Sequence, residues 1–205
     1  MAETSTGPGR PASGRPREFD LDQALDQALL VFWKQGYEGA SLTDLTTAMG
    51  IGKPSMYAAF GNKQELFRRA LDRYAEGPGS YVARALEQPT ARQVAEVLLR
   101  GAVQTTTAPQ GFGGCLTVQG ALAASPESQP ARDILVPWRN EAMRRLADRL
   151  RRALDDGDLP PDADPDRLAR YLATVVFGIA VQAASGLDAG SLDDVVDTAL
   201  LSWPA

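Results

Sequence analysis

The chain has 205 residues, of which 44% are hydrophobic, and a formal net charge of -5; such a composition supports a substantial core and excludes wholesale disorder. It contains no histidine and 1 cysteine, which excludes a histidine-based metal site, a catalytic triad and an intrachain disulfide. No segment reaches the roughly 18 apolar residues of a membrane span, and residues 1–18 lack the apolar run of a signal peptide, so we expect a cytoplasmic protein with no membrane partner.

The charges are unevenly distributed along the chain. Residues 1–75 hold 9 of the 21 basic and 9 of the 26 acidic residues, so the whole net charge of -5 falls in residues 76–205. Binding of a polyanion by the N-terminal third therefore depends on where its charges lie rather than on their sum.

Residues 1–17 are rich in glycine and proline and nearly free of apolar side chains, which predicts a flexible arm that carries Arg10, Arg15 and Arg17. Asp20 can cap a first helix, because apolar residues follow it at helical spacing. Gly36 is expected to end that helix.

Residues 41–67, SLTDLTTAMGIGKPSMYAAFGNKQELF, have the pattern of two short helices joined by a tight turn. Ser41 and Asp44 form a start like a capping box, and Gly50 is suited to end the first helix. The second short helix runs to Phe60, and Asn62 can cap a longer helix that begins at Lys63.

The same stretch fits a helix-turn-helix unit, in which a first helix braces a second whose N-terminal side chains reach base edges. Lys53 and Ser55 can contact phosphates or bases, Pro54 can touch a thymine methyl group, and the Tyr57 hydroxyl can reach a phosphate. Lys63 lies at the start of the next helix, where backbone amides already favour a phosphate. The bracing residues are Leu42, Leu45, Met49, Ile51, Met56 and Phe60. A helical hairpin with merely solvated polar residues fits the spacing as well.

Residues 18–75 resemble the N-terminal domain of the TetR (tetracycline repressor) family of bacterial transcriptional regulators. The resemblance is carried by the stretch TDLTTAMGIGKPSMYAAFGNKQELF, with its Gly50-Ile51 turn, its Tyr57 and Phe60 pair and its Asn62-Lys63 entry into the next helix. It implies that a set of positions lies at or near DNA, namely Thr43, Lys53, Pro54, Ser55, Tyr57 and Lys63.

The chain departs from the common family pattern at Ala58 and Ala59, where a histidine or another polar residue is frequent. Because of this departure, we expect DNA binding to depend mainly on phosphate contacts and on Lys53, Pro54 and Ser55. The candidate DNA-binding residues are Arg15, Arg17, Ser41, Thr43, Lys53, Pro54, Ser55, Tyr57 and Lys63.

Beyond residue 76 the pattern stays helical. Gly77-Pro78-Gly79 predicts a kink or a short break, and Asp164-Pro165-Asp166 is a strong start for an apolar helix that reaches about Ser185. The other expected helices are 90–106, a short apolar one at 115–124, a long one that opens at 125–127 with a bend at Pro137, and a last one from Ser191. No period-2 strand is evident, so the fold class is all-α with about nine helices.

The family resemblance implies that the chain from about residue 77 forms a helical ligand-sensing and dimerising domain. The expected organisation is a flexible basic arm (1–17), a three-helix helix-turn-helix domain (18–76) and this second domain (77–205).

Dimerisation also has support from the residues themselves. The helix at 165–185 is apolar on nearly every side, the last helix has one apolar stripe, and Gly178, Ala180 and Ala184 would permit close approach of a second copy. A core helix inside one chain is the alternative. The candidate interface residues are Leu168, Tyr171, Leu172, Val175, Ile179, Val195, Ala199 and Trp203.

The expected ligand pocket is mainly apolar, which suits an apolar or aromatic effector with one or two hydrogen bonds. Its candidate lining residues are Tyr81, Phe112, Cys115, Leu116, Trp138, Met143 and Phe177. Plain core packing is the alternative for each of them. A redox role for Cys115 lacks support, because no Lys or Arg lies within four residues of it.

These patterns predict a homodimeric transcriptional repressor that a small ligand releases from palindromic operator DNA. The rival interpretation is a helical ligand-binding or scaffolding protein without DNA binding, against which the polar set at Lys53, Ser55, Tyr57 and Lys63 argues. An enzyme is disfavoured, because the sequence contains no pair of acidic residues at a spacing typical of a catalytic site. We also expect no cofactor and no metal.

The arm allows a first test. If residues 1–17 reach into a neighbouring minor groove, as arms on other helix-turn-helix proteins do, their deletion flattens the fall of log K with log salt. A solubilising tail fits the composition equally well and predicts an unchanged slope. Titrations of DNA at several salt concentrations decide between the two.

Overall fold

The computed structural model describes residues 19–108, 113–118 and 129–204. Within these ranges it has nine α-helices with described bounds, one 3₁₀ helix, a helical stretch at 116–118 inside the predicted helix 115–124, and no strand, which confirms the all-α fold. The elements are α1 (Leu21–Gly39), α2 (Leu42–Ala48), α3 (Lys53–Phe60), α4 (Lys63–Glu76), η1 (Pro78–Ser80), α5 (Tyr81–Leu86), α6 (Ala91–Thr107), α8 (Gln129–Asp155), α9 (Pro165–Ala184) and α10 (Ala189–Leu201).

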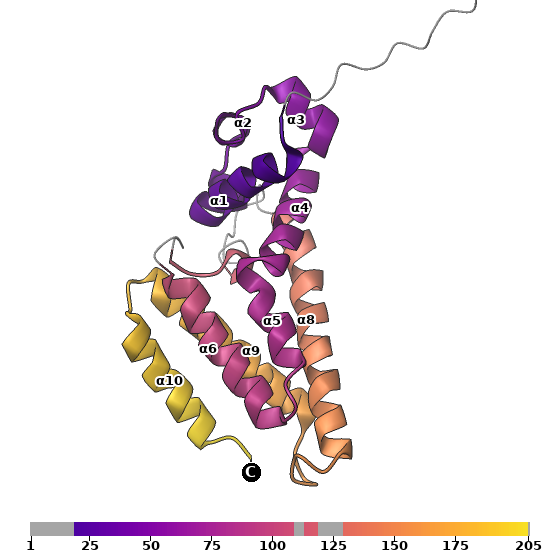
Figure 1. The fold of residues 1–205 in the computed structure, drawn as a ribbon, viewed down its shortest axis with the longest axis vertical. Coiled ribbons are helices and arrows are strands. Elements are labelled where there is room, and N and C mark those ends of the chain that lie inside the picture. The colour runs from indigo at the N-terminus through magenta and orange to yellow at the C-terminus, as the bar shows by residue number, and fades with distance from the viewer. Residues whose placement is uncertain (1–18, 109–112, 119–128, 205) are drawn as a thin grey trace, which may run out of the picture.

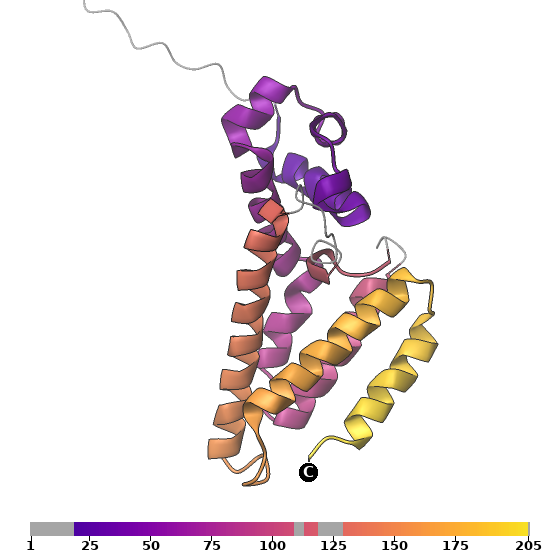
Figure 2. The ribbon, with the colours of Figure 1, turned by 180° about the vertical axis from the view of Figure 1, so that it is seen from behind.

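The helices form two parts. α1 to α4 make a head at one end of the molecule, and α5 to α10 make a larger body (Figure 1). α4 leads from the head towards the body, where it meets the upper part of α8 (Figures 1 and 2). The arm with Arg15 and Arg17 lies outside the described residues.

The caps predicted for the head are confirmed. The Asp20 carboxylate accepts from the backbone N–H groups of Asp22 and Gln23, and the Asn62 side chain accepts from the Glu65 N–H at 2.9 Å. These bonds satisfy amides that a helix start leaves unpaired. They fix where α1 and α4 begin.

The glycines of the head behave differently from one another. Gly50 follows α2 with φ of 67°, a left-handed conformation that glycine adopts at little cost. Gly36 was expected to end α1, but the helix continues to Gly39 with a kink at Gly36, where φ is 71° and ψ is 175°. The kink lets the last turn of α1 change direction before α2.

Aromatic rings hold α1 against α4. The Phe67 ring of α4 lies edge-on to both Phe32 and Tyr37 of α1, at centroid distances of 5.0 and 5.1 Å. Arg73 of α4 adds a bidentate ion pair to Asp26 of α1 at 2.7 and 3.0 Å. Because both charged side chains are more than a third exposed, this pair contributes at most about 1 kcal/mol. The buried rings therefore hold the two helices together.

In the body, α6 packs against α5, α9 and α10, and α8 packs against α9. The predicted break after α4 is confirmed, because η1 separates α4 from α5. Asp164 caps α9 as predicted. α10 begins at Ala189 rather than at Ser191, because Asp188 is its cap and accepts from the Ser191 N–H. Pro137 lies inside α8, and the predicted opening at 125–127 lies outside the described residues.

The two parts share a core across the predicted boundary at residues 76 and 77. Cys115, Leu116 and Val118 pack into the same buried cluster as α1 and α4. The indole N–H of Trp33 in α1 donates to the Gly114 carbonyl at 3.1 Å. The segment 113–118 is thus a direct link between body and head.

Close packing of α5 on α6 yields a stability test. A Cβ atom at Gly101 of α6 would lie 2.5 Å from the Cβ of Tyr81. Gly101→Ala should therefore lower the free energy of unfolding, since overpacking costs about 1–3 kcal/mol against about 1 kcal/mol of improved helix propensity. Thermal unfolding measures the change. Gln104→Ala, on the exposed face of α6, is the control, and a higher Tm for Gly101→Ala would contradict the packing argument.

Candidate nucleic-acid interface and internal cavity

α3 exposes its first turn and buries its opposite face. Met56 and Phe60 are at most 2% exposed in the core of the head. The candidate residues Lys53, Pro54 and Ser55 are exposed, as is Tyr57. α3 lies at the far end of the head, away from the body (Figure 1). The core thus holds α3 so that the candidate DNA-contacting side chains face outwards.

α2 contributes Ser41 and Thr43, which are both exposed. The Ser41 hydroxyl donates to the Asp44 carboxylate at 2.6 Å and accepts from the Asp44 N–H at 3.0 Å. The carboxylate also accepts from the Ser41 N–H, which completes the capping box and lowers the pKa of Asp44. The Ser41 donor is therefore engaged within the protein, and Ser41 serves the interface by fixing the start of α2.

Lys63 is half-buried at the start of α4. Its Nζ atom lies 4.5 Å from the centroid of the Tyr37 ring, a geometry that attracts a cation to an aromatic face. Partial burial lowers the pKa of Lys63, and the nearby Glu38 opposes this shift. Tyr37 thus restricts the lysine to one region of the surface. The sequence analysis did not assign this role to Tyr37, because the kink at Gly36 determines where the ring lies.

The C-terminal part of α3 offers few polar groups. Ala58 is exposed and Ala59 is half-buried. Arg69 of α4 donates to the Ala59 carbonyl at 3.2 Å, and its guanidinium lies 5.6 Å from the Phe60 ring. Arg69 is therefore a cation beside α3 that the sequence analysis did not identify.

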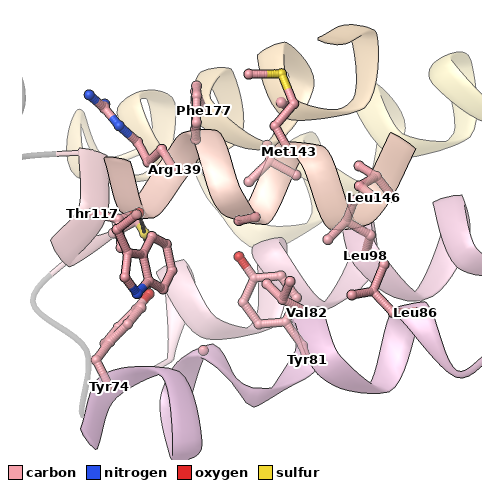
Figure 3. A pocket seen from close by; sticks show the side chains of 16 residues that line it. Tyr74, Tyr81, Val82, Leu86, Leu98, Thr117, Arg139, Met143, Leu146 and Phe177 are labelled. Carbon is pink, nitrogen blue, oxygen red and sulfur yellow. Dashed lines mark hydrogen bonds between the residues drawn. The ribbon is translucent and has the colours of Figure 1, made fainter. Parts of the chain in front are cut away.

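A partly open cavity lies in the body, bounded by the end of α4, η1, α5, α6, α8, α9 and the segment 113–118 (Figure 3). Its volume is about 80 Å³. Of the sequence-derived candidates, Tyr81, Cys115, Trp138, Met143 and Phe177 line it. Leu116 does not, because it is fully buried in the cluster that includes α1 and α4. Phe112 lies outside the described residues.

The cavity also holds polar groups that the sequence analysis did not identify. The Tyr74 hydroxyl lies 3.2 Å from the Cys115 Sγ, and that sulfur lies 3.0 Å from the Thr117 Oγ1. Burial, followed by the nearby Cys115, raises the pKa of Tyr74 and of Tyr81, so both hydroxyls stay protonated at neutral pH. They are hydrogen-bond donors in an otherwise apolar wall.

Arg139 of α8 is the cation of the cavity. Its guanidinium lies 5.8 Å from the Phe177 ring, and burial lowers its pKa while the nearby Cys115 opposes the shift. Cys115 therefore has an arginine within electrostatic range, although none lies within four residues of it in sequence. Arg139 lies 24 positions further along the chain, so only the packing of α8 brings the two together.

The candidate interface residues of α9 and α10 separate into two groups. Leu172, Ile179, Ala199 and Trp203 are buried in the chain's own core. Leu168 and Val175 are half-buried, while Tyr171 and Val195 are 39% and 44% exposed. A shallow groove between the two helices is lined by Tyr171, Val175, Asp194, Val195, Thr198 and Ala199. The small residues Gly178 and Ala184 are exposed, whereas Ala180 is buried.

α9 is, among the described helices, the one long and apolar enough to cross a membrane by length and composition alone. A core helix passes the same test, and α9 packs against α6 and α8. In the part of the chain that the structure describes, no cluster of acidic, cysteine or histidine side chains could hold a metal ion.

The chain matches known proteins along its length. Residues 24–70 match the family described as "Bacterial regulatory proteins, tetR family", and residues 90–199 match the "Tetracyclin repressor-like, C-terminal domain". It is 32% identical to the transcriptional repressor ComR of Escherichia coli, over 100% of this chain and 98% of ComR. It is 29% identical to the repressor BdcR of the same species, over 94% of this chain and 91% of BdcR.

Solved structures of TetR-family regulators are also similar to this chain. The TetR family transcriptional regulator CifR, in a cysteine mutant complexed with 26 bp double-strand operator DNA, is 47% identical with a TM-score of 0.87. That match covers 93% of this chain and 100% of the CifR chain. A TetR regulator from Rhodococcus is 40% identical with a TM-score of 0.59, over 90% of this chain and 100% of that one. The head with its exposed α3 and the helical body behind it are thus those of a regulator, and this chain belongs to the TetR family of bacterial regulatory proteins.

Proposed function

We propose that this protein is a homodimeric, sequence-specific transcriptional repressor that a small ligand releases from palindromic operator DNA. The observation that carries the proposal is the first turn of α3, which is exposed on the outside while Met56 and Phe60 fix the other side in the core. The relatives ComR and BdcR are named repressors, and CifR is described in complex with operator DNA.

In this proposal α3 lies in the major groove. Lys53 and Ser55 contact base edges or phosphates, and Pro54 lies against a thymine methyl group. Tyr57 and Lys63 contact the backbone and set the register of α3 on the duplex. Arg69 adds a positive charge beside α3. Lys53, Lys63 and Arg69 bring three positive charges to this interface although the whole chain has a net charge of -5, and charges placed beside the DNA attract the phosphates.

A palindromic operator requires two heads, with their recognition helices about 34–36 Å apart. The groove between α9 and α10 supplies a surface for a second copy, because Tyr171 and Val195 are exposed apolar residues beside it. Val181 and Leu201 extend the apolar surface and are 42% and 86% exposed. Two copies of α9 and α10 would then form a four-helix interface.

The ligand acts through α4. Lys63 begins this helix at the proposed DNA surface, and Tyr74 near its other end lines the cavity. A ligand that displaces Tyr74 moves α4 and changes the distance between the two heads. The ligand shifts the protein to the DNA-free state only to the extent that it binds that state more tightly.

The rival function is a helical ligand-binding or scaffolding protein without DNA binding. A fluorescence titration with the protein's own upstream DNA separates the two, because the rival predicts no binding above that to random DNA at the same salt concentration. The exposed polar set on α3 favours the repressor.

Two substitutions test the roles in DNA binding. Lys63→Ala should weaken binding to operator and random DNA by the same factor and reduce the salt slope by about 1, because it removes one phosphate contact. Ser55→Ala should instead change the preference among sequences. Fluorescence titrations with operator and random duplexes measure both effects.

The control is Arg84→Ala, which removes one positive charge from α5 in the body and should leave the ratio of operator to random binding unchanged. Equal losses on operator and random DNA for Ser55→Ala would refute the assignment of Ser55 to base reading.

The dimer surface allows a matched pair of variants. Val195→Glu should raise the dimer dissociation constant at least tenfold, because it places a charge beside Asp194 in an apolar interface. Val136→Glu on α8 is the control, since Val136 is 43% exposed against 44% for Val195. Analytical ultracentrifugation measures both. If both variants raise the dimer dissociation constant by the same factor, the groove between α9 and α10 is not the dimer surface.

A further inference from the structure

We infer that the ligand of the cavity is a small carboxylate, whose anionic group pairs with Arg139 and whose short hydrocarbon part contacts Trp138 and Phe177. This inference rests on the proposed function only in taking the cavity as the effector site. It adds an anionic group to the sequence-based expectation of an apolar or aromatic effector with one or two hydrogen bonds.

The first reason is that the positive charge of Arg139 has no acidic partner within the described ranges. Arg139 is half-buried at a largely apolar cavity, and no ion pair joins it to a carboxylate in the part of the chain that the structure describes. The neighbouring acids of α8 are used elsewhere, since Glu141 and Asp148 both pair with Arg144. The guanidinium faces the Phe177 ring at 5.8 Å but has no carboxylate partner among the described residues, and an anionic ligand would compensate the free energy of its partial desolvation.

The second reason is an unused donor. Tyr81 is 4% exposed, and its hydroxyl makes no hydrogen bond to another described residue. Figure 3 shows this hydroxyl pointing towards α8 from the opposite side of the cavity, and Arg139 at one edge of it. Among the described residues, Trp203 Nε1 is the fully buried side-chain polar atom without a partner, so the Tyr81 hydroxyl keeps access to the cavity and can donate to a ligand that carries an acceptor. In Figure 3 the Arg139 guanidinium lies at the edge of the cavity and away from the Tyr81 hydroxyl, so the anionic group is assigned to Arg139 and the Tyr81 hydroxyl is a separate donor.

The size of the cavity limits the hydrocarbon part. An apolar cavity of about 150 Å³ holds benzene, whereas this one has about 80 Å³. A ligand of a few carbon atoms fits without movement of the wall. The apolar wall, formed by residues such as Trp138, Met143 and Phe177, favours a carboxylate with an alkyl chain over inorganic phosphate, which has no apolar part to bury.

Tryptophan fluorescence can test the inference, because Trp138 lines the cavity. The full-length protein is titrated with acetate, propionate and butyrate, with the neutral isostere butyramide, and with inorganic phosphate. We expect butyrate to bind at least tenfold more tightly than butyramide and than phosphate. Absence of binding by all three carboxylates, or equal affinity for butyrate and either butyramide or phosphate, overturns the proposal without the need for any variant.

Variants then assign the effect to Arg139. Arg139→Met, which removes the charge and keeps the length, should bring butyrate and butyramide within about twofold of each other, whereas Arg139→Lys should retain the preference. Arg145→Met removes an exposed arginine from the same helix and should retain it too. A preference that survives in Arg139→Met contradicts the assignment.

Operator binding without ligand separates this inference from the proposed function. Failure of the unaltered protein to bind DNA would refute the repressor and leave the ratio of butyrate to butyramide affinities intact. Operator binding combined with equal affinity for the two compounds would refute only the carboxylate.

Discussion

The arrangement depends on one rigid helix that belongs to both parts of the molecule. α4 carries Lys63 at its first residue and Tyr74 near its last turn, which places about 16 Å of helix between them at 1.5 Å per residue. The Phe67 ring of α4 packs edge-on against the stacked rings of Phe32 and Tyr37, which holds α4 against α1. In the proposed mechanism, a displacement of α4 at the cavity would therefore move the helices of the head together.

The segment 113–118 makes this coupling stronger. Its Gly114 carbonyl holds the Trp33 indole of α1, and its Cys115 sulfur contacts the Tyr74 hydroxyl of α4. Trp33 and Tyr74 also pack edge to face, with ring centroids 5.1 Å apart. One short segment thus touches both long helices of the head beside the cavity. A ligand at Cys115 would act on α1 and α4 together, which favours a concerted movement over local unfolding of either helix.

Local signals were sufficient to predict the head, but not the cavity. The caps at Asp20, Ser41 and Asn62 are determined by residues within three positions, so the sequence alone locates them. Arg139 and Cys115 come from distant segments, and helical periodicity says which residues are apolar but not which neighbour each one meets. For the same reason, the sequence indicated the apolar stripes of α9 and α10 but did not show which of their residues are buried. Leu172 and Ile179 are buried in the core of the chain, whereas Val195 is exposed.

The small number of polar groups on α3 makes the spacing of the heads important. With Ala58 exposed and the Ala59 carbonyl held by Arg69, the proposed base reading by one head rests on Lys53, Pro54 and Ser55. Such a head gains little discrimination alone, since each good bidentate contact supplies about 1–3 kcal/mol. Sequence selection then relies on two heads engaging two half-sites together, and on the shape of the DNA between them. In the proposed dimer, a small change in the separation of the heads would remove one half-site from reach, so a modest movement of α4 would be enough to release the operator.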